Sequence, residues 1–187
     1  KMAVGMGANV TVLDLNLERL GYLDDIFDKR ITTLYASRGN VLKAIKEADL
    51  VVGAVLVPGA TAPILIRKED LKLMKQGAVI VDVAIDQGGN AETSHVTTHD
   101  DPIFKVDGII HYCVANMPGA VARTSTLALA NATLPYGLKL AAKGVEGACA
   151  ADKGLLEGLN CYDGKCTYKG VAEALDLEYT DPAELIK

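Results

Sequence analysis

A carboxylate, a carboxamide and two glycines follow one of the most apolar runs of this sequence. Val79–Val83 is rich in β-branched residues, as buried parallel strands are, and Asp86-Gln-Gly-Gly89 comes soon after it. In an open α/β sheet, ligands bind outside the carboxyl ends of the strands, and glycines let a ligand approach the backbone closely. A carboxylate at such a place can accept and return a proton. We therefore predict that Asp86 is catalytic, although Asp-Gln-Gly-Gly by itself is more typical of a tight turn.

Two further apolar runs end in polar residues. The alternating run Asn9–Leu15 contains the acid Asp14 near its end, and in dinucleotide-binding folds such an acid binds the ribose hydroxyls. Because the Gly-rich phosphate turn lies about 20 residues before that acid, we expect the chain to begin inside the first helix of such a fold. The run Gly108–Val114 leads into Ala115-Asn-Met-Pro-Gly119. Asn116 could bind a cofactor or substrate there, or only satisfy the loop backbone.

The chain alternates between strand and helix patterns. We expect strands at 9–15, 31–35, 49–54, 79–83 and 108–114, and helices at 16–27, 40–48 and 68–74 between them. This pattern predicts an α/β fold with a doubly wound parallel sheet, whose first strand and Gly-rich turn are absent. We expect residues 1–124 to form this nucleotide-binding domain. Residues 125–187 would form a long helix kinked near Pro135 and then a mainly helical tail with helices near 153–159 and 169–175. This tail would belong to a second domain.

Composition excludes several classes of partner. The chain has 187 residues, of which 50% are hydrophobic, and a formal net charge of −5 with no cluster of Lys and Arg. This argues against binding to nucleic acid or an anionic membrane, and no segment is apolar for long enough to span a bilayer. No secretory signal precedes the cysteines, so we predict reduced thiols in the cytoplasm. The spacing Cys161-x4-Cys166 could suit a metal, but no second Cys or His pair lies nearby, and we predict no metal site.

The sequence resembles the alanine dehydrogenase family, which is related to the NAD-binding part of proton-translocating transhydrogenase. The resemblance extends over nearly the whole chain and rests on motifs that occur in the family's order. These motifs are Met6-Gly-Ala-Asn-Val-Thr-Val-Leu-Asp14, Ala48-Asp-Leu-Val-Val-Gly-Ala-Val-Leu-Val-Pro-Gly-Ala60, Val81-Asp-Val-Ala-Ile-Asp-Gln-Gly-Gly89 and Tyr112-Cys-Val-Ala-Asn-Met-Pro-Gly-Ala120.

The resemblance implies an enzyme and a set of site residues. It implies NAD as cofactor, reversible oxidative deamination of L-alanine to pyruvate and ammonia, and a cytoplasmic homo-oligomer, in the family a hexamer. Asp86 would be catalytic, Asp14 and Arg19 would hold the adenosine ribose, and Ser37 would lie near the adenine. Val55 and Leu56 would border the cofactor with their backbone. The nicotinamide would be lined by Val83, Ala84, Ile85, Asp86, Val114, Ala115, Asn116 and Met117, and His95 stands where related sequences often carry Arg against the cofactor.

Two alternatives stay open. The family's catalytic His and its substrate-binding Arg and Lys belong to an N-terminal region that we expect this chain to lack, so the chain alone should be inactive. The first alternative is the NAD(H)-binding module of a transhydrogenase. The second is a nucleotide-binding fragment without chemistry.

Overall fold

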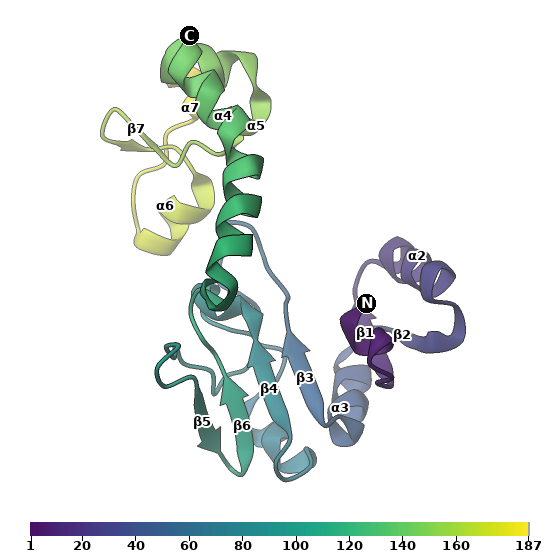
Figure 1. The fold of residues 1–187 in the computed structure, drawn as a ribbon. Helices are drawn as coiled ribbons and strands as arrows, with labels where there is room; N and C mark the ends of the chain where they lie inside the picture. The colour runs from purple at the N-terminus through teal and green to yellow at the C-terminus, as the bar shows by residue number, and fades with distance from the viewer. Residues whose placement is uncertain (187) are drawn as a thin grey trace. The chain divides into compact units, whose positions relative to one another are not determined.

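The computed structural model describes residues 1–186, and the chain divides into two compact units (Figure 1). Unit 1 comprises Lys1–Val55 and Pro63–Ala115, and unit 2 comprises Leu56–Ala62 and Asn116–Lys187. Each unit is therefore built from two separate stretches of the chain.

Unit 1 follows the expected alternation of strands and helices. Asn16 accepts a hydrogen bond from the N–H of Arg19 and begins the second helix where the sequence predicts it. The elements are α1 (Met2–Gly5), β1 (Val10–Asp14), α2 (Leu17–Phe27), the 3₁₀ turn η1 (Asp28–Arg30), β2 (Ile31–Tyr35), α3 (Arg38–Glu47), β3 (Leu50–Gly53), η2 (Lys68–Leu73), β4 (Val79–Asp82), η3 (Val83–Gln87), β5 (Ile103–Val106) and β6 (Ile109–Tyr112).

The strands of unit 1 form two sheets. β1 pairs with β2 in parallel, and a separate sheet has the order β3-β4-β6-β5. In this second sheet β3, β4 and β6 are parallel, which confirms the expected parallel pairing, while β5 is an antiparallel edge strand that the sequence pattern did not predict. In the strand order of dinucleotide-binding folds, the first strand lies between the second and the fourth. The second and fourth strands of that order correspond to β1 and β3, and the two sheets of unit 1 separate between β1 and β3.

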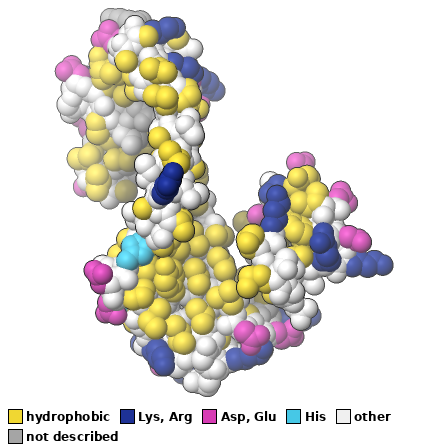
Figure 2. Space-filling model, in the orientation of Figure 1, with side chains coloured by type: hydrophobic (Ala, Val, Ile, Leu, Met, Phe, Trp, Pro, Cys, Tyr) yellow, Lys and Arg dark blue, Asp and Glu magenta, His cyan; other side chains and the backbone are white. Residues whose placement is uncertain are grey.

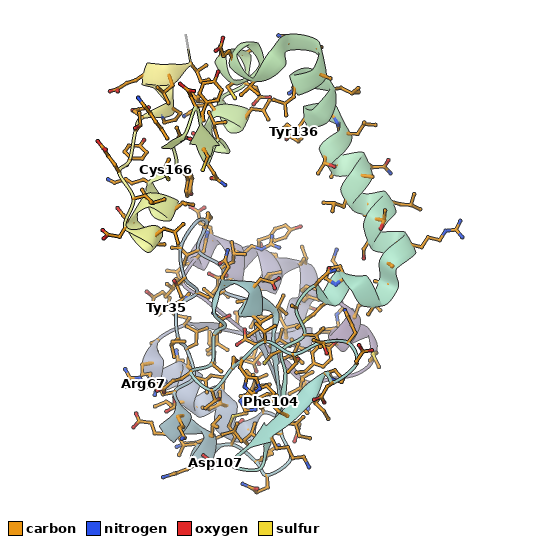
Figure 3. The ribbon with its side chains drawn as sticks, turned by 90° about the vertical axis from the view of Figure 1, so that its left-hand side faces the viewer. Tyr35, Arg67, Phe104, Asp107, Tyr136 and Cys166 are labelled. Atoms are coloured by element: carbon orange, nitrogen blue, oxygen red, sulfur yellow. The ribbon has the colours of Figure 1, made fainter. Side chains whose placement is uncertain are left out.

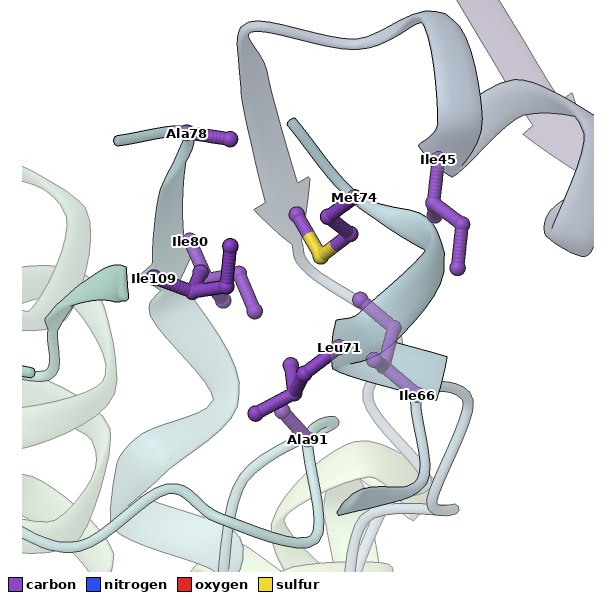
Figure 4. Close-up of a cluster of buried hydrophobic side chains, with 8 residues drawn as sticks. All are labelled: Ile45, Ile66, Leu71, Met74, Ala78, Ile80, Ala91 and Ile109. Carbon is purple, nitrogen blue, oxygen red and sulfur yellow. The ribbon is translucent and has the colours of Figure 1, made fainter. Parts of the chain in front are cut away.

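Helices and apolar side chains cover one face of the four-stranded sheet. Ile80 of β4 and Ile109 of β6 pack in a cluster with Ile45 of α3 and Leu71 of η2 (Figure 4). The opposite face is open over β3, where Leu50 is 57% exposed and Val52 56%. Figure 2 shows hydrophobic side chains gathered over this sheet. The core of unit 1 therefore lies between the sheet, α3 and η2.

Unit 2 is mainly helical. Its elements are η4 (Met117–Val121), α4 (Ala122–Ala151), α5 (Lys153–Glu157), the hairpin strands β7 (Cys161–Tyr162) and β8 (Lys165–Cys166), α6 (Lys169–Leu175) and α7 (Pro182–Leu185). The expected kink at Pro135 is wrong in position. The backbone leaves the helical region at Gly144, where φ is 69°, a conformation that glycine adopts without strain. In the described part of the chain, no helix combines the length and apolarity needed to cross a membrane.

Candidate functional site at the carboxyl ends of the strands

Asp86 is exposed on the 3₁₀ turn that follows β4. Because β3, β4 and β6 are parallel, their carboxyl ends meet at one edge of the sheet, and Asp86 lies at that edge. Gly88 and Gly89 complete the turn with φ of 96° and 87°. A Cβ on Gly89 would lie 2.8 Å from Oδ2 of Asp82, so both the backbone conformation and the packing require glycine there.

Asp82, the last residue of β4, is fully buried and organises the loop that follows Asp86. Its Oδ2 accepts hydrogen bonds from the N–H of Asn90 at 2.7 Å, the N–H of Ala91 at 3.1 Å and Oγ of Ser94 at 2.6 Å. A buried carboxylate needs such donors to offset its lost hydration. Asp82 therefore holds the segment Asn90–Ser94, which follows the turn that carries Asp86.

Asn90 connects this turn to the end of β3. Its Oδ1 accepts the N–H of Val55 at 2.9 Å, and its Nδ2 donates to the carbonyls of Val55 at 3.1 Å and Pro63 at 3.0 Å. Gly53 makes room for this contact, since a Cβ on it would lie 3.0 Å from Cβ of Asn90. The buried side-chain amide of Asn90 thus holds Val55 and Pro63, the two residues of unit 1 that flank the segment Leu56–Ala62.

A second set of buried polar groups lies behind the turn. Cys113 donates to Oγ of Ser94 across 3.7 Å, and burial raises the pKa of this thiol. Burial also lowers the pKa of His111, which favours the neutral ring. Its Nδ1 must carry the proton, because it faces the carbonyl of Ile109 at 3.2 Å, while Nε2 accepts from Thr93 Oγ1 at 2.8 Å. The side chains of His111 and Cys113 are closed to solvent, and Thr93 and Ser94 are partly buried beside them.

The residues predicted to bind the adenosine end lie at the carboxyl end of the β1–β2 sheet. Asp14 is exposed at the end of β1. Ser37 follows β2 and accepts the N–H of Asn40 at 3.3 Å, so it caps α3, which begins two residues before the expected start at 40. The guanidinium of Arg19 lies 5.0 Å from the centroid of the Tyr22 ring. The roles of these residues toward a ligand stay predictions.

The residues predicted to line the nicotinamide differ in exposure. Val83 and Val55 are exposed, whereas Ala84, Ile85 and Val114 are buried, so these three could contact a ligand only through the backbone. His95 is exposed and stacks on Phe104, with 3.6 Å between ring centroids. Ala115 is the last residue of unit 1; the remaining candidates, Leu56, Asn116 and Met117, belong to unit 2.

Sequence reasoning missed Asp82, Asn90 and Ser94. Asp82 was treated as part of an apolar strand, although strand periodicity places it on the same face as the buried Ile80. A carboxylate on the buried face requires donors nearby, and the polar residues soon after the two glycines could have indicated them. Among residues 1–186, no group of His, Cys, Asp or Glu side chains could hold a metal ion.

Asp14 is exposed at the carboxyl end of β1 in one parallel pair, and Asp86 follows β4 in the other sheet. Polar residues at the carboxyl ends of parallel strands are typical of nucleotide-dependent α/β enzymes. Comparison with known proteins specifies the family. Residues 1–169 match the sequence model of the alanine dehydrogenase/PNT C-terminal domain. The chain belongs to this family, whose alanine dehydrogenases are oxidoreductases that use NAD.

Several relatives carry the name alanine dehydrogenase. The protein from Methanococcus maripaludis is 59% identical over 185 residues, covering 98% of this chain and 49% of the relative. That from Bacillus subtilis is 56% identical, covering 98% and 49%. A solved L-alanine dehydrogenase is similar over 94% of this chain and 48% of its own, with a TM-score of 0.81 and 47% identity. The chain therefore spans about half the length of these relatives.

A transhydrogenase is a more distant structural neighbour. The transhydrogenase from Sinorhizobium meliloti is similar over 75% of this chain and 39% of its own, with a TM-score of 0.61 and 26% identity.

Proposed function

We propose that this chain forms the cofactor-binding part of an NAD-dependent alanine dehydrogenase, which converts L-alanine, NAD⁺ and water reversibly into pyruvate, ammonium, NADH and a proton. One observation carries the proposal. The carboxylate of Asp86 is exposed at the carboxyl edge of a parallel sheet, in a chain of the alanine dehydrogenase family. When bound, NAD accepts the hydride from the substrate carbon.

Asp86 is the proposed acid and base. Loss of hydride from the carbon that bears the deprotonated amino group leaves an iminium ion, and water must lose a proton as it adds to the iminium carbon. The carboxylate of Asp86 takes that proton and returns it to the nitrogen. The C–N bond then breaks as the C=O bond of pyruvate forms, and the hydroxyl proton released in this step converts the departing ammonia to ammonium. Its place on a turn held by Asp82 and two left-handed glycines keeps the carboxylate in one position without a long flexible loop.

The chain's own groups fit the adenosine end of NAD. The carboxylate of Asp14 is exposed, and its Oδ1 already accepts the N–H of Asn16 at 2.9 Å, which orients the group. An ionised carboxylate held in this way accepts hydrogen bonds from ribose hydroxyls. Arg19 and Ser37, exposed at the same sheet end, complete the proposed contacts with the ribose and the adenine.

At the nicotinamide end, the hydrogen bonds of unit 1 refine the expected contacts. The N–H and the carbonyl of Val55 both bond to Asn90, so Val55 would border the cofactor mainly with its exposed side chain. Ala84, Ile85 and Val114 are buried and would present only backbone. We retain Val83, His95, Ala115, Leu56, Asn116 and Met117 as proposed contacts.

The test is Asp86→Asn in the full-length protein. Asn is nearly isosteric and suits turns as well as Asp does, so a purely structural role predicts normal turnover. A proton-transfer role predicts that kcat falls by about 10²–10⁴-fold with nearly unchanged NAD affinity. Asp107→Asn is the matched control, because Asp107 is also exposed in a turn but precedes β6 at the other end of that strand. Turnover of Asp86→Asn close to that of the control would contradict the role of Asp86.

A transhydrogenase-like function is the second candidate, favoured by the similarity to the Sinorhizobium meliloti protein. The two functions differ in the hydride donor. Alanine-dependent formation of NADH by the full-length protein supports the dehydrogenase. Hydride transfer from NADH to NADP⁺ without any response to alanine would favour the second candidate and exclude the first.

We also propose that the full-length protein is a cytoplasmic homo-oligomer, with the hexamer of the family as the expected state. Light scattering coupled to size-exclusion chromatography measures the molar mass of the assembly. A monomer at micromolar concentration would contradict this proposal.

A further inference from the structure

Two cysteines face each other across the hairpin of unit 2. β7 and β8 pair in antiparallel fashion, and the register places Cys161 directly opposite Cys166 (Figure 3 labels Cys166). Asp163 and Gly164 connect the strands with φ of 48° and 72°. The tight two-residue hairpin turn that matches the twist of its strands requires positive φ at both central residues. The turn has this conformation, so it determines the register of the two strands.

The hydrogen bonds around the hairpin identify the kind of pair. The N–H of Thr167 donates to the carbonyl of Asn160 at 2.8 Å, one position further from the turn. Bonded and non-bonded pairs alternate along an antiparallel ladder, so Cys161 and Cys166 form a non-hydrogen-bonded pair. The carbonyl of Cys166 accordingly points away from Cys161 and accepts the N–H of Thr180 at 2.9 Å.

A non-hydrogen-bonded pair brings the two backbones close. Its Cα atoms lie about 4.5 Å apart, within the range of about 4.4–6.8 Å found for disulfides. Residues directly opposite each other also project their side chains to the same face of the hairpin. The register alone therefore places the two thiols within reach of a bond.

The two thiols differ in access. Both are free in this structure, with Cys161 exposed and Cys166 only 7% exposed. Sγ of Cys166 lies 3.6 Å from the carbonyl of Tyr168, to which it donates. An exposed thiol backed by a shielded partner is the arrangement in which one cysteine meets an oxidant and the other resolves it.

We propose that Cys161 and Cys166 are an oxidisable dithiol that closes to an intramolecular disulfide when it meets a low-molecular-weight disulfide such as oxidised glutathione. The Cys161 thiolate attacks one sulfur of glutathione disulfide, whose S–S bond breaks and releases one glutathione thiolate. The Cys166 thiolate then attacks the sulfur of Cys161 and releases the second. The two cysteines are oxidised, one glutathione disulfide is reduced to two thiols, and the two cysteine protons pass to the released thiolates.

The experiment exposes the native full-length protein to oxidised glutathione, blocks the remaining thiols by alkylation and digests it with trypsin. Trypsin cuts after Lys165 and so separates the two cysteines onto different peptides. We expect these two peptides to be recovered joined, without an alkyl group or glutathione, and to separate after reduction. The buried Cys113 and Cys149 serve as internal controls and should react only after unfolding.

Two single variants test the order of the steps. Cys166→Ser should trap glutathione on Cys161, and Cys161→Ser should leave Cys166 reduced. Both changes replace sulfur by oxygen in a short surface hairpin, and circular dichroism verifies that each variant is folded. Complete alkylation of both thiols in the treated wild type would overturn the proposal, as would a persistent mixed disulfide on Cys161 or a disulfide between two molecules.

Discussion

Asp82 and Asp86 are close in sequence, but their surroundings differ: Asp82 is buried and Asp86 is exposed. Asp82 is buried and accepts three hydrogen bonds through one oxygen, so it organises the loop. Asp86 is exposed, so its carboxylate is open to a ligand. Residue type alone does not separate the two. Strand periodicity does, because Asp82 alternates in phase with Ile80.

At the residue scale, the exposed acid at the end of β1 leads to a prediction about cofactor choice. Asp14 would accept hydrogen bonds from the ribose hydroxyls of NAD and would repel a 2′-phosphate. We expect the full-length protein to prefer NAD over NADP, and Asp14→Ser to weaken that preference by about tenfold or more, the effect of losing a charged hydrogen-bond acceptor. Comparing kcat/KM for the two cofactors measures it.

Arg19 provides a second test of the cofactor preference. Its guanidinium lies over the Tyr22 ring and could turn to bind the 2′-phosphate of NADP. Arg19→Gln in the Asp14→Ser background should remove any gain with NADP. Equal use of both cofactors by the unmodified protein would contradict the role of Asp14.

At the element scale, the sequence predicts those features that depend on local patterns. The strands ending at Asp14 and Tyr35 and the helix Lys169–Leu175 occur as expected, because alternation, caps and turn residues act over a few neighbours. β5 was missed although its turn to β6, Asp107-Gly108, is a strong hairpin signal, because the expected strand was begun at Gly108 and the apolar residues before the turn were left out. We expected a kink at Pro135, because proline in a helix interior removes a hydrogen bond and clashes with the preceding turn. The helix breaks at Gly144, because glycine can adopt the positive φ of the break without strain.

The link between the end of β3 and the loop after the Asp86 turn depends on the side chain of Asn90. Asn90→Asp would remove the two N–H donations to the carbonyls of Val55 and Pro63 and place a negative charge beside them. We expect a loss of about 1–3 kcal/mol in the free energy of unfolding, the cost of leaving buried acceptors unpaired. Urea unfolding measures it, with the exposed Asn9→Asp as the matched control. Equal unfolding midpoints for the two variants would show that the amide is not needed.

The contact between α3 and η2 predicts a dependence of stability on pH. Asp70 is almost fully buried, and burial alone would raise its pKa. Hydrogen bonds from the Arg38 guanidinium at 2.6 Å and the Arg67 N–H at 2.7 Å outweigh burial, so the pKa of Asp70 is lower than its ordinary value of 3.8. A lowered folded-state pKa means that this contribution is complete above the unfolded-state pKa. It is lost as the pH falls below that value through the folded-state pKa.

Asp70→Asn should therefore destabilise the protein by about 1.5–3 kcal/mol at neutral pH and by much less in acid. Chemical unfolding of both proteins at several pH values between neutral and acid follows the difference. A difference that stays constant over this range would contradict the proposed ionic contact.

At the scale of the whole molecule, the limits of sequence reading come from contacts between distant residues. Val55 and Asn90 are 35 positions apart, and neither residue type indicates the other. A boundary between domains near residue 124 stays a prediction. The compact units change after Ala115, and the short segment Leu56–Ala62 belongs to unit 2, which a reading by composition along the chain does not detect.

This interleaving has a consequence for exchanging parts between relatives. Leu56–Ala62 belongs to unit 2, where Gly59 lies so close to Tyr168 that a Cβ on Gly59 would overlap the ring, and where Tyr168 Oη lies 3.5 Å from the carbonyl of Pro58. A chimera joined between residues 115 and 116 would pack a foreign tail on a native segment 56–62.

We expect such a chimera to have a lower Tm than either parent, and we expect transplanting residues 56–62 together with 116–187 to restore it. Differential scanning calorimetry of the two chimeras decides the matter, and equal Tm values would mean that the short segment is indifferent to its donor. If the second chimera is the more stable one, residues 56–62 and 116–187 must come from the same parent. Recombination between genes of this family would then select against crossovers that separate these two segments.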